Sequence, residues 1–161
     1  MADISQNKAV VFTAAREKIR RYCAFQERCR DDVRQKLREW QIEAGKAEQL
    51  IKELVAEGYI NEERFAKAFA RGKFKIKSWG IAKIVYDLKR RNISEDCIAL
   101  ALKEIDGETY QATLHKLAKQ WLAKHKTETD LVRKQKLFRY LLSKGYKSDE
   151  IERCLNRDLP D

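Results

Sequence analysis

The side chains of this sequence that are best suited to binding chemistry are cations in its middle third. Lysine and arginine alternate with other residues in one run, and further cations follow in the next helical pattern: Arg71, Lys73, Lys75, Lys77, Lys83, Lys89, Arg90 and Arg91. Ammonium and guanidinium groups bind the anionic oxygens of phosphates and carboxylates. We therefore predict an anion- or partner-binding surface here. A spacing of two brings the first four onto one side only in an extended or distorted segment, because a helix distributes them around its axis.

The last third carries a further basic cluster, which would extend this surface: Arg133, Lys134, Lys136 and Arg139. For every cluster the alternative is a solvated helix end, and at residues 89–91 the helix dipole alone favours cations. Trp79 has two interpretations, a platform on which a base stacks or a side chain packed between helices, and its place beside Gly80 favours packing.

Residue patterns typical of enzymes are missing from the sequence. It contains no phosphate-binding glycine loop, no nucleophile beside a base and no carboxylate pair in a plausible cleft. His115 and His125 are ten residues apart, and the four cysteines lack C-x-x-C spacing. We expect a protein that is not an enzyme, with reduced cysteines, no metal and no cofactor.

Composition and charge favour a partner that is negatively charged. Of 161 residues, 43% are hydrophobic and 37% are charged, with a net charge of +10. Residues 1–58 carry +2, residues 59–106 carry +4 and residues 107–161 carry +4. Such an excess attracts polyanions or acidic protein surfaces, although it could also serve solubility alone. Without a long apolar run or a signal-peptide pattern, we expect a cytoplasmic protein that does not enter membranes.

Periodicity predicts an all-helical chain, since there is one proline, there are six glycines, and strand-like alternation is confined to residues 74–76. The first expected helix, about 9–25, has a predicted buried stripe of Val10, Ala14, Ile19, Tyr22 and Cys23. The others are expected from about 31, at 46–57, after Asn61, at 81–91, from 94, at 110–125, at 130–144 and after 150.

A repeat of about fifty residues organises these helices. The middle helix of each third carries apolar residues spaced by four and five: Val33, Leu37 and Ile42, then Ile84, Leu88 and Ile93, then Leu137, Leu141 and Tyr146. The offsets are 51 and 53 residues. We predict three tandem three-helix repeats (1–58, 59–106 and 107–161) stacked into an elongated curved body. Nothing resembles a long heptad seam, so we expect a monomer.

Several segments resemble the RecX family of bacterial recombination regulators. They are Tyr22-Cys23-Ala24-Phe25-Gln26-Glu27-Arg28 leading into Val33-Arg34-Gln35-Lys36-Leu37, then residues 58–69, then Trp79-Gly80 with Ile84, Leu88 and Ile93. The run from Gly58 to Phe69 is the most specific. Where the family often has a serine cap this chain has Arg30-Asp31, so Asp31 would have to cap the second helix. Asn61, the expected cap of the helix that follows it, stands where the family more often has Asp.

The resemblance implies a protein that binds RecA, above all the RecA filament on single-stranded DNA. Lying in the groove of the filament, it would limit extension or favour disassembly and so lower strand exchange, ATP hydrolysis and co-protease activity. Two other functions stay open: a basic helical protein that binds DNA by itself, and a scaffold whose charge is incidental.

Overall fold

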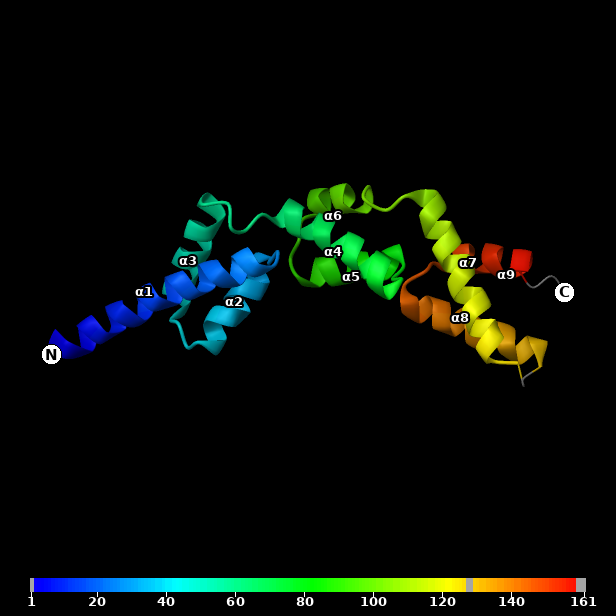
Figure 1. Cartoon of the computed structure of the whole chain (residues 1–161), viewed down its shortest axis with the longest axis horizontal. Coiled ribbons are helices and arrows are strands. Elements are labelled where there is room, and N and C mark those ends of the chain that lie inside the picture. The colour runs from blue at the N-terminus through cyan, green and yellow to red at the C-terminus, as the bar shows by residue number, and fades with distance from the viewer. Residues whose placement is uncertain (1, 127–128, 159–161) are drawn as a thin grey trace.

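The computed structural model describes residues 2–126 and 129–158, which are all-helical, with no strand among them. Its helices are α1 (Ala2–Phe25), α2 (Arg30–Glu39), α3 (Ala44–Ala56), α4 (Glu62–Lys77), α5 (Ile81–Arg90), α6 (Glu95–Leu102), α7 (Gly107–Lys124), α8 (Asp130–Lys144) and α9 (Ser148–Asp158). They form three tandem three-helix repeats, stacked end to end into an elongated curved body (Figure 1). The predicted fold class is therefore confirmed.

Two local expectations about the helices are wrong: the start and buried stripe of the first helix, and the cap of the second. α1 begins at Ala2, and its outer part projects past α2 and α3 (Figure 1), so Val10 is 67% exposed and Ala14 is exposed as well. The strand-like alternation at residues 74–76 lies within a helix, because α4 continues to Lys77 and ends at Ser78 with φ +53°. Asp31 does not cap α2: the Cys29 sulfur accepts the Asp32 N–H, and Asp32 accepts the Cys29 N–H in return. The expected cap Asn61 does accept the Arg64 N–H, at 2.8 Å.

The buried side chains form two separate apolar clusters. The first, with Ile19, Leu37 and Leu54 among its members, holds the first repeat together. The second runs through both of the other repeats and includes Leu88 and Leu137. The division at residues 58/59 and 106/107 stays a prediction; Tyr59 and Ile60 pack on the first cluster.

The first and second repeats meet through polar contacts. Arg91 of the second pairs with Asp32 of the first, and Asn92 donates to Asp31. Ion pairs also join Arg64 to Glu27 and Arg30 to Glu62. Cys29 is the exception, since it lies in the first repeat but packs in the second apolar cluster.

The second and third repeats meet through backbone hydrogen bonds. The N–H groups of Gly80 and Ala82 donate to the carbonyls of Lys144 and Gly145, at 2.8 and 3.0 Å. The Tyr146 hydroxyl donates to the Ser78 carbonyl at 3.0 Å. We call this contact between Gly80 and Gly145 the glycine joint. It connects the end of α8 directly to the start of α5, above the apolar cluster that both repeats share.

Titration of buried thiols is expected to weaken the fold at alkaline pH. Burial raises the pKa of Cys23 and of Cys29 from 9.0 to about 11. When burial raises the pKa of an acid in the folded state, its contribution to stability is fully present at pH values below the pKa that it has in the unfolded chain. That contribution is lost as the pH rises through the pKa that it has in the folded state. We expect each thiol to lower the free energy of unfolding by ~2–3 kcal/mol between pH 9 and 11. Urea unfolding of wild type and Cys29→Ala at pH 8.5 and 10.5 checks this, because the variant should lose less stability between the two pH values. Equal losses would contradict it.

Candidate partner-binding groove

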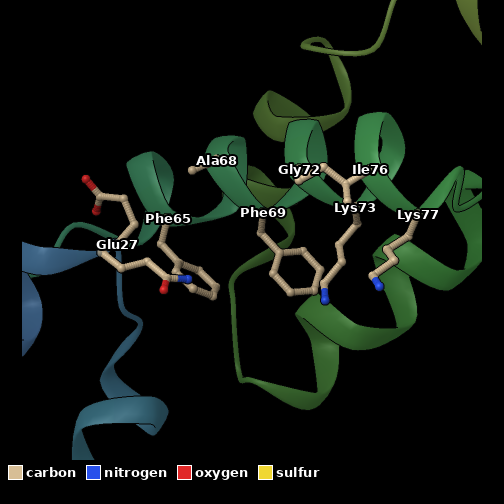
Figure 2. Close-up of a pocket in the computed structure, with 9 residues that line it drawn as sticks. Glu27, Phe65, Ala68, Phe69, Gly72, Lys73, Ile76 and Lys77 are labelled. Atoms are coloured by element: carbon tan, nitrogen blue, oxygen red, sulfur yellow. The ribbon is translucent and has the colours of Figure 1, made fainter.

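A groove runs along one face of α4, where the first repeat meets the second (Figure 2). We call it the α4 groove; its volume is about 380 Å³. Seven of its residues come from successive turns of α4, and two come from the segment after α1: Gln26, Glu27, Phe65, Ala68, Phe69, Gly72, Lys73, Ile76 and Lys77. Its floor is apolar, and two lysines lie at the end nearer the third repeat. An apolar floor with a few polar groups at its rim is typical of binding sites.

Lys73 and Lys77 lie one turn apart and extend to the same side of α4 (Figure 2). In the part of the chain that the structure describes, neither has a carboxylate within ion-pair distance. The Lys73 ammonium lies 4.8 Å from the centre of the Trp79 ring and 5.3 Å from that of Phe69. A ring face attracts a cation only modestly, so both lysines keep charge available for an anionic partner.

Trp79 packs against the core, as the packing interpretation predicted. It is half-buried, and its ring meets Phe69 edge-on at 6.4 Å. The Lys83 ammonium lies 4.6 Å from the ring centre and donates to the Ser143 carbonyl at 3.1 Å. Lys83 is thus part of the joint between the second and third repeats.

Because α4 is a regular helix, it divides the basic run into two sides. Arg71 and Lys75 point away from the groove. Arg71 pairs with Glu104 at 2.7 Å, and Lys75 lines a second pocket, of about 330 Å³, facing α7. The structure therefore brings only Lys73 and Lys77 of these four together in the groove.

The cations that end α5 are mostly engaged within the chain. Lys89 pairs with Glu95 at 3.1 Å, and Arg91 pairs with Asp32 and lies 5.5 Å from the Phe69 ring centre. Arg90 is exposed beside Tyr86 and lines a small pocket with Asp31 and Asp32.

The predicted cations of the third repeat lie on α8, and none of them is among the residues that line the α4 groove. Arg133 is largely buried: it pairs with Asp130 at 3.1 Å and donates to the Leu122 carbonyl at 3.3 Å. Arg139 and Lys136 are exposed and Lys134 is half-buried. Whether any of these cations binds a partner stays a prediction.

The histidines and the C-terminal cysteine of residues 2–126 and 129–158 make contacts within the chain. His115 contacts the Cys154 sulfur at 3.5 Å, and His125 stacks on Trp121. In that part of the chain no three His, Cys, Asp or Glu side chains gather closely enough to hold a metal ion. Likewise, none of its helices has the length and hydropathy needed to span a bilayer.

The floor of the groove was not predicted from the sequence, because the basic run was considered for its cations and its apolar residues were not assigned to a binding site. Ala68, Gly72 and Ile76 are spaced by four, which places them on one face of a helix. A glycine inside a helical pattern, one turn before an isoleucine, was the available signal.

Comparison with known proteins places this helical chain in a family. A model described as the second three-helix domain of RecX matches residues 61–102, and one for the third three-helix domain matches residues 108–155. The chain belongs to the RecX family. "Regulatory protein RecX" of Clostridium perfringens strain SM101 is 37% identical over 120 residues, which are 73% of this chain and 56% of that protein.

Other RecX proteins agree with this membership. The one from Pelodictyon phaeoclathratiforme is 29% identical over 126 residues, 78% of this chain and 77% of that protein. The crystal structure of RecX from Lactobacillus salivarius has the same fold: its TM-score is 0.77 at 21% identity, covering 92% of this chain and 97% of that one. The chain spans a little over half the length of the clostridial RecX that it matches.

Proposed function

We propose that this chain binds RecA and the RecA filament on single-stranded DNA, and that it does so in the cytoplasm as a monomer without enzymatic activity of its own. Bound along the filament, it limits extension or promotes disassembly, and so lowers strand exchange, ATP hydrolysis and co-protease activity. Membership of a family of regulatory proteins supports this proposal.

The observation that carries the proposal is the unneutralised pair Lys73 and Lys77 on an elongated body. Several cations of the first two repeats are paired with carboxylates, for example Arg71 with Glu104 and Arg34 with Glu48. Lys73 and Lys77 have no carboxylate partner in the part of the chain that the structure describes. An elongated stack suits a partner that is itself long and periodic, since it can make contacts along its whole length.

Titrating a preformed RecA–single-strand filament with this protein tests the proposal. We expect the ATPase rate to fall at protein concentrations well below that of RecA. A Lys73→Glu/Lys77→Glu variant should need about tenfold more protein for the same effect, because like charges then face the partner, and tenfold corresponds to ~1.4 kcal/mol.

Lys52→Glu/Lys103→Glu is the matched control, with the same change in charge at two exposed positions outside the groove. It should inhibit as the wild type does. If wild-type protein leaves ATPase rate and filament length unchanged, the proposed function is wrong. If both variants lose inhibition equally, net charge rather than the groove is responsible.

Stand-alone DNA binding is a second candidate, favoured by the charge of α7 and α8. Residues 116–144 contain nine basic and two acidic side chains. Binding to bare DNA would need no RecA, and its affinity would fall steeply with salt because counterions are released. Fluorescence anisotropy of a labelled single strand from 50 to 200 mM salt separates the two functions. Tight, salt-sensitive binding without any effect on RecA favours this candidate.

A further inference from the structure

We propose that the α4 groove receives a short amphipathic helix of the partner, with carboxylates on that helix facing Lys73 and Lys77. This inference rests on the proposed function and specifies which kind of partner segment is bound. It is carried by the shape, the apolar floor and the charge of the groove.

The dimensions of the groove suit about three helical turns. Phe65 and Lys77, at its two ends, are twelve residues apart in one helix, which corresponds to ~18 Å at 1.5 Å per residue. Ala68 and Gly72 lie one turn apart on the floor between them (Figure 2). Such small side chains let a second helix approach to ~8–10 Å between axes. A Cβ atom added to Gly72 would meet nothing within 4 Å, so this space is open.

The chemistry of the floor favours a helix over an added strand or a stacked base. The backbone N–H and carbonyl groups of α4 bond within the helix, so no sheet edge is available to pair with an extended peptide. The Trp79 ring is already contacted by the ammonium groups of Lys73 and Lys83, at 4.8 and 4.6 Å. Recognition must therefore use side chains that fit between Ala68, Gly72 and Ile76.

The charge and exposure of the rim determine which residues the partner helix must carry. Ile76 is 79% exposed, at the same end as the two lysines. Apolar partner residues one turn apart would cover Ile76 and the floor, and carboxylates on the flank of the same helix would meet Lys73 and Lys77. A DNA backbone would satisfy the two charges but would leave the apolar floor and Ile76 uncovered.

Filling the groove tests this inference while preserving the fold. In Gly72→Leu the added Cβ meets nothing within 4 Å, and leucine favours a helix interior more than glycine does. We expect thermal stability equal to or above that of wild type, and at least a tenfold rise in the concentration that half-inhibits the RecA filament ATPase. Gly107→Leu is the matched control, because a Cβ there also meets nothing within 4 Å and the site lies at the start of α7. Full inhibition by a folded Gly72→Leu protein would overturn the inference while leaving the proposed function intact.

Cross-linking gives a second readout that identifies the occupant. With p-benzoylphenylalanine at Ile76, irradiation of the complex with the RecA–DNA filament should give an adduct in a helical RecA segment that carries at least two carboxylates. An adduct in a strand or on the DNA would overturn the inference even if the wild type inhibits. If the wild type neither inhibits nor cross-links, both the groove inference and the proposed function are wrong.

Discussion

Replacing Gly80 with alanine is expected to lower the free energy of unfolding by about 3 kcal/mol, a large effect for the addition of one methyl group. A Cβ atom at this position would lie 2.3 Å from both the carbonyl carbon and the carbonyl oxygen of Gly145, and 2.5 Å from the Tyr146 nitrogen. These are backbone atoms, which cannot rotate away as a flexible side chain does. The hydrogen bonds from Gly80 to Lys144 and from Ala82 to Gly145 must therefore lengthen, and the joint between the second and third repeats must open.

Urea unfolding followed by circular dichroism measures this effect, with Gly72→Ala as the control. Gly72 lies inside α4, where an added Cβ meets nothing within 4 Å, so alanine should stabilise by up to ~1 kcal/mol through helix propensity. The two alanine substitutions should thus change stability in opposite directions. A Gly80→Ala protein as stable as the wild type would show that the two backbones are not in close contact.

Truncating Leu37 to alanine is expected to lower the stability of the first repeat by ~3 kcal/mol while sparing the other two. Leu37 is fully buried in the cluster that also holds Ile19 and Leu54. Removing three carbons from a closely packed site lowers the free energy of unfolding, because apolar burial is lost and a cavity remains. Since this cluster is separate from the one that runs through the second and third repeats, the loss should remain local.

Hydrogen exchange resolved by peptide tests this prediction with Leu88→Ala as its counterpart. Leu37→Ala should lose protection in α2 and α3 while α7 stays protected. Leu88→Ala, in the shared cluster, should lose protection in α4 to α9 together and spare α3. Uniform loss over the whole chain in both variants would mean that the molecule unfolds as one cooperative unit.

The repeat architecture could be predicted from sequence because each repeat encodes its core locally. Leu37, Leu88 and Leu137 are all fully buried, as their periodic spacing requires. Caps formed by common side chains, such as Asn61 and Ser94, could be predicted in the same way. These signals lie within a few residues of one another and need no knowledge of the neighbouring repeat.

Features that depend on distant neighbours could not be predicted. Periodicity assigned Ala14 to the core, whereas Ala14 is exposed and Ala15 is buried. The sulfur cap by Cys29 requires its burial against the second repeat. The α4 groove likewise needs Gln26 and Glu27 from the first repeat to form one end. Sequence alone therefore indicated a basic segment, and only the packing separated Lys73 and Lys77 from the other cations.

The two joints of this molecule should differ in stiffness. Exposed ion pairs such as Arg30–Glu62 each contribute at most ~1 kcal/mol and are screened by salt, whereas the glycine joint is fixed by main-chain bonding over a continuous apolar interior. Thermal bending of this elongated molecule should therefore be concentrated at the contact between the first and second repeats. The N-terminal repeat would then change its angle relative to the other two repeats, which move together as a single rigid unit.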